Sequence, residues 1–442
     1  MTQSKSPIVS FVLATHNRAS VVLQTLAHIA DCGLDRTDYE VIVVDNASVD
    51  GTPDAAAIHT DVLIRLDRNA GSCAKAFGCE RARGAYIVFL DDDSYPRPGS
   101  VGRMIEAFER HRSLGAAGFT AHLPDGGQEC SALPGVFIGC GVGLRTEALR
   151  AVGGLDAGLF MQAEEYDLSF RLAMTGWTVQ VYGDLKVEHL KTNQTRRSER
   201  TTYYDVRNNL LVLARYLPSP PRRIYEEDWL ARYTILAERS GQTDACARGV
   251  RAGRRAWWQR FKYRRYRLDD DIFERFFTWR FVERRMIDLR ADGVRTVVLA
   301  DLGKNVYAFY RAAKQAGVEI VAIADDTFAA PSRRYRGVPI LPVAAAIRLT
   351  PDAYVVSNTS YVHAGIRQAD LANRVDQPVF NWFGSPPTSR CGEDHSAAIV
   401  DRGIAETPKV VSKEVISEEV VSKEVVSKEV SGRSSLLLTT EN

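Results

Sequence analysis

Four short apolar runs near the N-terminus are each followed by a cluster of polar residues. The runs have the length of buried strands and are rich in β-branched residues. A helical pattern occurs between some of them, at residues 21–29 and 73–83. Strands that alternate with helices predict a parallel sheet of the α/β class. The predicted strands are residues 8–14, 40–44, 62–66 and 85–90.

The polar clusters occupy corresponding places on the predicted sheet. They span residues 15–18, 45–52, 67–71 and 91–94, each directly after its strand. Ligands of parallel sheets bind beyond the carboxyl ends of the strands. We therefore expect the four clusters to line one cleft.

The fourth cluster contains three consecutive carboxylates, Asp91, Asp92 and Asp93, directly after an apolar strand. Negative charges at such a place are costly unless a cation neutralises them. A divalent metal that carries a phosphate would meet this need, because Mg²⁺ prefers oxygen ligands and shares its shell with substrate phosphates. A solvated acidic turn is the alternative, and these residues alone leave both interpretations open.

Length and composition narrow the class of protein. A chain of 442 residues predicts two domains and additional segments. A net charge of +2 is too small to indicate nucleic acid as a partner. The seven cysteines have no metal-ligand spacing, which favours reduced thiols in the cytoplasm. We expect neither a signal peptide nor a membrane-spanning segment, since no apolar run approaches about 20 residues.

Residues 216–292 are predicted to be helical and are rich in basic and aromatic side chains. This composition suggests peripheral contact with an anionic membrane, at the inner face of the plasma membrane, where lipid-linked acceptors reside. A basic helical linker docked on the first domain is the alternative. Nucleic acid is less favoured, because no binding motif accompanies the charge. The residues concerned are Arg248, Arg251, Arg254, Arg255, Trp257, Trp258, Arg260, Phe261, Lys262, Tyr263, Arg264, Arg265, Tyr266 and Arg267.

Residues 293–386 are predicted to form a second, smaller α/β domain with strands at 297–300, 319–324, 353–356 and 378–382. Asp325 and Asp326 follow its second strand, where a ribose-binding carboxylate is expected. Gly303 is the one residue of a glycine-rich phosphate turn that is present. We therefore favour packing or self-association over nucleotide binding. Residues 387–442 contain a five-residue repeat without a continuous apolar face, which predicts a disordered or transiently helical tail.

Seven motifs in residues 1–215 resemble family 2 glycosyltransferases, which have the GT-A nucleotide-sugar fold. The resemblance implies a GT-A sheet at residues 1–215, and the 293–386 unit resembles the Rossmann-like domain at the start of sugar acyltransferases. The motifs, in family order, are ATHNR, VVDNASVDGT, RNAG, FLDDDSYPRPGSV, VGGLDAGLFMQAEEYDLSFRLAMTGW, VEHL and YYDVRNNLL.

The resemblance also implies an inverting transfer from a UDP- or dTDP-sugar to a saccharide or lipid-linked saccharide, with Mg²⁺ or Mn²⁺ as cofactor. Glu165 stands where the family has an aspartate base, and Glu164 is the alternative base. Arg207 and Asn208 match a family feature to which no role is assigned. The implied ligands of the metal are Asp93, Asp91 and His189; the implied nucleotide-sugar contacts are Thr15, Arg18, Asp45, Asn69, Asp91 and Asp92; and the implied acceptor-side residues are Asp156 and Asp167.

Three functions remain open at this stage. The first is the glycosyltransferase of a cell-surface polysaccharide or glycolipid. The second is a nucleotide-sugar-binding protein without activity, which Glu165 in place of aspartate would allow. The third is a nucleotidylyltransferase, which would need a glycine-rich basic loop after the first strand. The residues 14–18 that follow that strand do not form such a loop.

Overall fold

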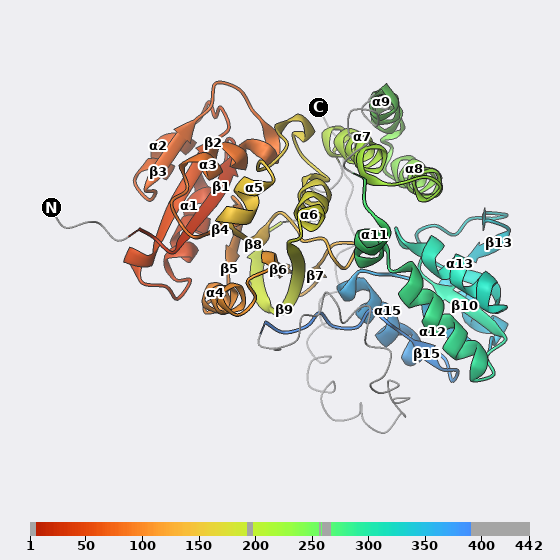
Figure 1. Cartoon of the computed structure of the whole chain (residues 1–442). Helices are drawn as coiled ribbons and strands as arrows, with labels where there is room; N and C mark the ends of the chain where they lie inside the picture. The colour runs from red at the N-terminus through yellow and green to blue at the C-terminus, as the bar shows by residue number, and fades with distance from the viewer. Residues whose placement is uncertain (1–5, 192–197, 256–257, 259–266, 390–442) are drawn as a thin grey trace, which may run out of the picture. The chain divides into compact units, whose positions relative to one another are not determined.

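The computed structural model describes residues 6–191, 198–255, 258 and 267–389 (Figure 1). The chain divides into units of residues 1–401 and 402–442, and every described residue belongs to the first. The repeat tail lies outside the described residues, apart from its first three positions. So do several predicted basic and aromatic residues, namely Trp257, Arg260, Phe261, Lys262, Tyr263, Arg264, Arg265 and Tyr266.

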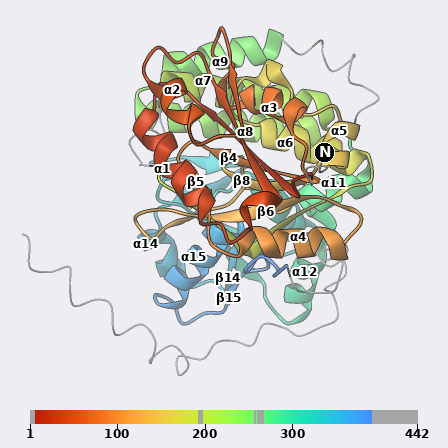
Figure 2. The same cartoon turned by 90° about the vertical axis from the view of Figure 1, so that its left-hand side faces the viewer.

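The first sheet has the strand order β3-β2-β1-β4-β8-β6-β9-β5, with β7 paired to β6. Its first four strands are parallel, as predicted (Figures 1 and 2). Beyond β4 the sheet is mixed, because β8 runs antiparallel to both β4 and β6. The bounds are β1 Val9–Thr15, β2 Tyr39–Asp45, β3 Val62–Arg65, β4 Tyr86–Asp91, β5 Ser94–Pro96, β6 Leu114–His122, β7 Gln128–Glu129, β8 Gly141–Arg145 and β9 Thr178–His189.

Both faces of this sheet are buried. In β1, Phe11 belongs to one apolar cluster and Val12 to the other, as the alternation of side chains along a strand requires. Helices α1 and α4 cover the first face, and α5 and α6 cover the second. The helical elements of this region are α1 Ala19–Ala30, η1 Arg36–Asp38, α2 Thr52–Ala57, η2 Gly71–Ala74, α3 Lys75–Arg81, α4 Ser100–Arg110, α5 Thr146–Ala151, η3 Ala157–Leu159 and α6 Glu164–Met174.

A helical region follows, with a core rich in aromatic side chains. Trp229 and Tyr225 from α8 pack with Phe276 and Phe277 from α11. The aromatic residues of this core are buried. Of the aromatic side chains predicted to contact a membrane, Trp258 alone lies within the described residues, and it is 59% exposed. The helices are α7 Glu199–Tyr216, α8 Pro221–Ser240, α9 Thr243–Arg255, α11 Asp270–Phe277 and α12 Trp279–Ala291.

The second sheet has the order β12-β13-β11-β10-β14-β15, and it is parallel except for the β12–β13 pair. Four of its strands agree with the predicted runs. The elements are β10 Thr296–Ala300, α13 Val306–Ala316, β11 Glu319–Ala324, β12 Arg334–Tyr335, β13 Val338–Leu341, α14 Val343–Ala346, η7 Ile347–Leu349, β14 Ala353–Val356, α15 Tyr361–Ala372 and β15 Val379–Phe380.

The turn after β10 is bonded to the helical region. The indole of Trp229 donates to the Lys304 carbonyl at 2.8 Å, and Arg232 donates to the Leu302 carbonyl. The Asn305 side chain is fully buried, donates to the Phe277 carbonyl at 2.9 Å and accepts from the Tyr225 hydroxyl at 2.5 Å. Helix α8 therefore contacts the edge of the second sheet at which a nucleotide would bind.

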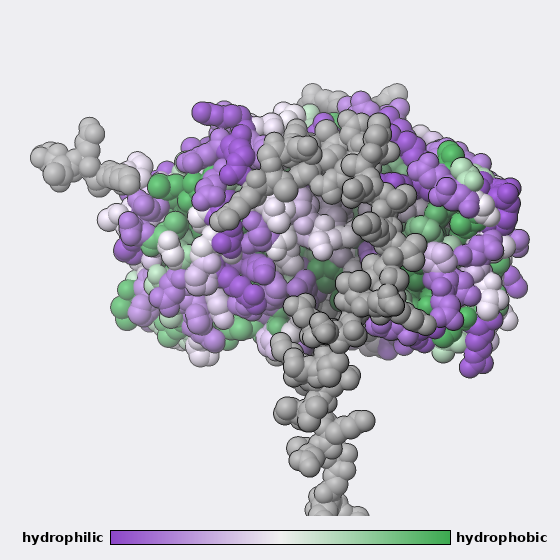
Figure 3. All heavy atoms as spheres, turned by 90° about the horizontal axis from the view of Figure 1, so that it is seen from below, coloured by the Kyte–Doolittle hydropathy of each residue, from purple (hydrophilic) through white to green (hydrophobic). Residues whose placement is uncertain are grey.

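Among the described residues, no helix is both long enough and apolar enough to cross a bilayer. On the face shown in Figure 3, hydrophobic side chains are scattered among hydrophilic ones.

We predict that Asn305→Ala lowers the free energy of unfolding by about 1–3 kcal/mol, because it leaves two buried polar groups without their partner. Urea unfolding followed by circular dichroism measures this difference. The exposed Asn373 provides the control, and Asn373→Ala should leave the unfolding midpoint nearly unchanged. Equal midpoints for the two variants would contradict the packing role of Asn305.

Candidate functional site

A cavity of about 610 Å³ opens at the carboxyl ends of the parallel strands. The clusters after β1, β3 and β4 contribute to it, as the sequence predicts, and Asn46 contributes from the cluster after β2. Most predicted site residues line it, namely Thr15, Arg18, Asn69, Asp91, Asp92, Asp93, Glu164, Glu165 and His189. Asp45, Asp156 and Asp167 do not.

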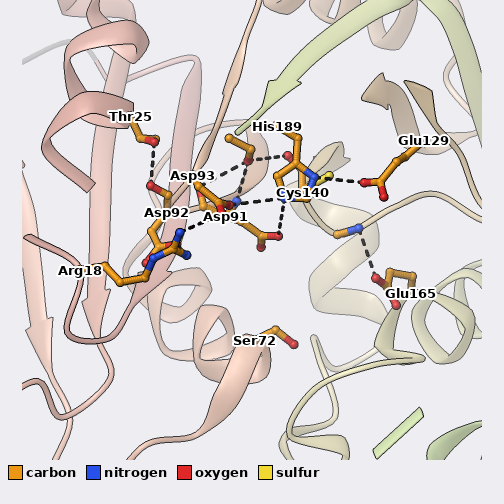
Figure 4. A network of polar contacts seen from close by, with 12 residues as sticks. Arg18, Thr25, Ser72, Asp91, Asp92, Asp93, Glu129, Cys140, Glu165 and His189 are labelled. Atoms are coloured by element: carbon orange, nitrogen blue, oxygen red, sulfur yellow. Dashed lines mark hydrogen bonds and ion pairs between the residues drawn. The ribbon is translucent and has the colours of Figure 1, made fainter. Parts of the chain in front are cut away.

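Each of the three consecutive aspartates has a different cationic or polar partner (Figure 4). Asp91 forms a 2.6 Å ion pair with Lys75, whose side chain is buried. Asp92 accepts from Arg18 at 2.6 Å and from Thr15 at 2.8 Å. These partners come from β1, from the loop after it and from α3, so the three elements meet at the end of β4.

Asp93 lies between two cations. Its carboxylate is 3.0 Å from the Arg18 guanidinium and 3.4 Å from Nε2 of His189, which ends β9. Burial would raise the pKa of Asp93, but the hydrogen bonds and charges of His189 and Arg18 lower it to about 2. The sequence prediction that Asp93 and His189 act together is consistent with this arrangement.

The other groups in the cluster also have altered pKa values. Burial raises the pKa of Asp92 to about 6, although Arg18 and Thr15 oppose the shift. Burial would lower the pKa of His189, but its neighbours Cys140, Asp93 and Asp91 raise it to about 10. Burial would also lower the pKa of Lys75, and the Asp91 carboxylate raises it instead. The carboxylates of the cluster therefore favour the positively charged forms of His189 and Lys75.

Ligand atoms of Asp91, Cys140 and His189 lie within 4.8 Å of one another, which is close enough for one metal ion to contact all three. Asp93 adjoins this group through its contact with His189. Carboxylate and imidazole ligands fit Mn²⁺ and, for the carboxylates, Mg²⁺, whereas a thiol is a softer ligand than either metal prefers. The residues present therefore fit a divalent metal of this kind.

Glu164 and Glu165 begin α6 and line the same cavity. Glu164 accepts a 2.5 Å hydrogen bond from Ser72 through Oε1, whereas its buried Oε2 has no hydrogen-bond partner among the residues that the structure describes. Glu165 accepts a 3.3 Å hydrogen bond from the Gly139 backbone. Burial and the charge of Glu165 raise the pKa of Glu164 to about 8, and burial raises the pKa of Glu165 as well.

Asp45 is buried at the end of β2 and accepts from the Ser48 backbone at 3.2 Å. Within the described part of the chain, its Oδ1 has no hydrogen-bond partner. Beside it, Asn69 accepts from the Gly71 backbone at 2.8 Å and lines the cavity. Asp45 thus retains a buried oxygen that can accept a hydrogen bond from a ligand.

Asp156 and Asp167 were predicted to lie on the acceptor side of the site, but neither lines the cavity. Both side chains instead bond to other residues of the protein. Asp156 accepts from the Gly158 backbone and forms a 2.7 Å ion pair with Arg215. Asp167 is almost completely buried and contacts Arg171, Arg215 and Tyr216. These two carboxylates connect α6 and the preceding turn to α7.

Four site residues were missed by the sequence reasoning. Lys75 lies in a helical pattern where a lysine normally indicates a solvated face, and Ser72 lies in an ordinary turn. Cys140 lies between two glycines, and its thiol has no metal-ligand spacing to another cysteine of the sequence. Glu129, which is 3.2 Å from Nδ1 of His189, lies on a two-residue strand that has no sequence signal.

Comparisons with known proteins find similarity to glycosyltransferases. The family described as "Glycosyl transferase family 2" matches residues 10–133. The succinoglycan biosynthesis protein ExoO of Rhizobium meliloti (strain 1021) is 40% identical over 107 residues, covering 23% of this chain and 30% of the relative. The undecaprenyl-phosphate 4-deoxy-4-formamido-L-arabinose transferase of Aeromonas hydrophila subsp. hydrophila is 32% identical over 115 residues, covering 24% and 35%.

Among solved structures, TarS 1-349 of S. aureus aligns with a TM-score of 0.43 and 13% identity, covering 75% of this chain and 98% of that chain. This chain spans about a third of the length of the two curated relatives named above. The match to glycosyl transferase family 2 covers residues 10–133, which belong to the N-terminal α/β region of this chain.

Proposed function

We propose that this chain is an inverting, metal-dependent glycosyltransferase that moves a sugar from a UDP- or dTDP-sugar to a hydroxyl group of a polysaccharide or glycolipid acceptor. The family match and the relative named for succinoglycan biosynthesis support the reaction class. One observation carries the proposal. A single cavity contains both a carboxylate cluster suited to a metal and a pair of glutamates with raised pKa values.

Asp91, Asp93 and His189 would hold Mg²⁺ or Mn²⁺, and the bound metal would neutralise the leaving diphosphate. Arg18 and Lys75 contact the same carboxylates and line the same part of the cavity. Both side chains therefore supply further positive charge beside the phosphate groups. Asp45 would accept a hydrogen bond from an N–H group of uracil or thymine through its free Oδ1.

The glutamate pair would remove the proton from the acceptor hydroxyl group. Two buried carboxyl groups cannot easily ionise together, and burial beside the charge of Glu165 raises the pKa of Glu164, which favours a proton on Glu164. Glu165 is then the ionised member and acts as general base. A hydroxyl group activated there attacks the anomeric carbon from the side opposite to the diphosphate, which inverts its configuration.

A screen of nucleotide sugars for release of the product nucleotide tests this proposal. The expected result is turnover of one UDP- or dTDP-sugar, accelerated by an extract that contains the acceptor. Turnover of a GDP-sugar would correct the nucleotide base. Binding of nucleotide sugar without turnover would favour an inactive binding protein, and release of pyrophosphate from a nucleoside triphosphate would favour a nucleotidylyltransferase.

The second α/β domain is proposed to have a packing role. Both carboxylate oxygens of Asp325 are engaged by backbone N–H groups, one by Leu302 and the other by Thr327 and Phe328. The Asp325 carboxylate therefore already accepts three backbone hydrogen bonds, with which a ribose hydroxyl group would have to compete. Self-association through this domain would be an additional role, which the molar mass of the protein in solution would reveal.

Our metal prediction concerns Asp93. Asp93→Asn should abolish transfer and weaken Mn²⁺ binding in titration calorimetry, because it removes an anionic ligand and leaves the shape nearly unchanged. Chelation by EDTA should inactivate the wild type reversibly. The exposed Asp54 is the control, and Asp54→Asn should retain activity and metal binding. Full activity in EDTA would exclude the metal mechanism.

Our base prediction contrasts two isosteric variants. Glu165→Gln should reduce turnover by about 10²-fold or more with donor binding unchanged. Glu164→Gln should retain most of the turnover, because glutamine resembles the protonated acid. In the wild type, activity should fall as the pH decreases through a pKa above the ordinary glutamate value, since the base must be ionised. The reverse ranking of the two variants would assign the base to Glu164.

We also propose that α9 contacts an anionic membrane surface. Four exposed arginines lie on α9, namely Arg248, Arg251, Arg254 and Arg255. The last three follow Arg248 by three, six and seven positions, which places all four on one side of the helix. Combined Arg251→Gln, Arg254→Gln and Arg255→Gln substitutions should weaken binding to phosphatidylserine vesicles. Added salt should weaken wild-type binding too, because exposed charges are screened beyond about 8 Å at physiological ionic strength.

The control for this prediction removes the same charge elsewhere. Arg81, Arg112 and Arg348 are also exposed and come from separate parts of the chain. Their replacement by glutamine should leave vesicle binding intact. Equal binding of the wild type to neutral and anionic vesicles would contradict the electrostatic contact.

A further inference from the structure

The backbone of the segment that precedes Glu164 and Glu165 accepts hydrogen bonds from other parts of the chain. Residues 158–162 form one side of the turn between η3 and α6, and each of their five carbonyl groups accepts a hydrogen bond from a distant residue. Arg207 donates to Gly158 at 3.0 Å; Asn208 donates to Leu159, Met161 and Gln162 at 2.8, 2.7 and 2.9 Å; and the Cys73 backbone donates to Phe160 at 3.1 Å.

The same segment has a strained backbone. Phe160, Gln162 and Ala163 have φ values of 68°, 68° and 64°, in the left-handed region that residues with a Cβ atom rarely adopt. Strained conformations persist when the surrounding structure fixes them, and they concentrate at functional sites. The five external hydrogen bonds supply that restraint.

The strained segment lies at the cavity and directly before the two glutamates. Phe160, Met161 and Gln162 line the cavity, and the chain continues directly into Glu164 and Glu165. Any movement of the segment would therefore move both the wall of the cavity and the start of α6. Because the aspartates lie at the end of β4 and His189 ends β9, movement of the segment would change the distance between these residues and the two glutamates.

Asn208 makes three of the five bonds. Its side chain is fully buried on α7, and its Nδ2 lies within 2.9 Å of three carbonyl oxygens. Arg207 donates to Oδ1 of Asn208 at 3.0 Å, which turns the NH₂ group of the amide toward the segment. An aspartate at position 208 would have the same shape and would present an acceptor to three acceptors.

The donor-side turn holds the segment from the other direction. A Cβ atom at Gly71 would lie 2.2 Å from the Phe160 carbonyl oxygen, so this position requires glycine. Ser72, next to it, donates to Glu164. The phenyl ring of Phe160 stacks on Tyr204 of α7, with ring centroids 4.7 Å apart. The segment is thus clamped between η2 and α7.

We propose that Asn208 is a positioning residue for glycosyl transfer, which holds residues 158–163 in their strained form and so places the acceptor-side wall of the cavity and the general base. The inference rests on the proposed transferase function. It assigns a role to Asn208 in the YYDVRNNLL motif, which the sequence alone leaves unexplained.

Asn209 is the matched control for a purely structural role. It is also buried, it is the next residue of the same helix, and its Nδ2 donates to the carbonyl and carboxylate oxygens of Asp205 on α7. None of the bonds to residues 158–162 described above comes from Asn209. A loss of helix stability alone would therefore affect both positions, whereas loss of the clamp affects position 208.

The experiment combines hydrogen exchange with kinetics for Asn208→Asp, Asn208→Ala and Asn209→Ala. Both variants at position 208 should accelerate amide exchange in residues 158–167 and lower turnover by about 10²-fold, as expected when reacting groups are misplaced by an ångström. Acceptor KM should rise, and Kd for the product nucleotide should stay within about threefold, because the donor side is untouched. Asn209→Ala should show neither local exchange nor the kinetic split.

Two results would overturn the proposal. One is unchanged exchange in residues 158–167 of a folded Asn208 variant, and the other is a parallel loss of activity and melting temperature in the Asn208 and Asn209 variants. If both Asn208 variants fail to fold, Arg207→Ala tests the same clamp from the exposed side, and the same exchange pattern is expected. Exchange is measured without substrate, so a chain that turns over no donor would refute the proposed function and leave the clamp to be judged separately.

Discussion

Three adjacent carboxylates at the end of a buried strand impose the constraint on which this site depends. β4 is apolar until Leu90, and the next three residues are all acidic. Each of them requires compensation, and the fold supplies Lys75, Arg18 and His189 from three different elements. The strand order that brings β1, β4 and β9 together is therefore also the arrangement that neutralises the aspartates. The surrounding negative charge raises the pKa values of Lys75 and His189, which indicates that the carboxylates are not fully neutralised. The remaining negative charge can be compensated by a divalent metal.

The second half of the site depends on helices outside the sheet. α6 presents Glu164 and Glu165 at its first turn, and its position is fixed by Asp167 through Arg215 and Tyr216 of α7. α7 in turn contacts the second α/β domain, where Lys304 donates to Asn209. α7 thus has polar contacts to the second domain through Asn209 and to the turn before Glu164 and Glu165 through Asn208. This arrangement is consistent with the packing role that we propose for the second domain.

Much of the fold was predictable from periodicity. Alternation of apolar runs and polar turns located the parallel strands, because a strand buried on both faces has a nearly continuous apolar run. The mixed half of the sheet was not predictable, since β5 and β7 have two or three residues and their pairing is set by distant partners. The aspartate cluster and His189 were located because each directly follows a strand. The roles of Lys75, Glu129 and Cys140 were not predictable, because they depend on contacts across 16 to 60 positions of the chain. The position of Asp167 was not predictable either, because the sequence at the start of a helix does not show whether an acidic residue faces a cavity or a buried arginine.

The position of a bound metal tests this interpretation most directly. Crystals grown with Mn²⁺ and UDP would give an anomalous signal that locates the ion without reference to any assumed mechanism. We predict a single strong peak within about 2.5 Å of a carboxylate oxygen of Asp93 or Asp91 and in contact with the diphosphate. A diphosphate bound by Arg18 and Lys75 with no manganese peak at the aspartates, or a peak elsewhere in the chain, would contradict the assignment of these carboxylates as the metal site.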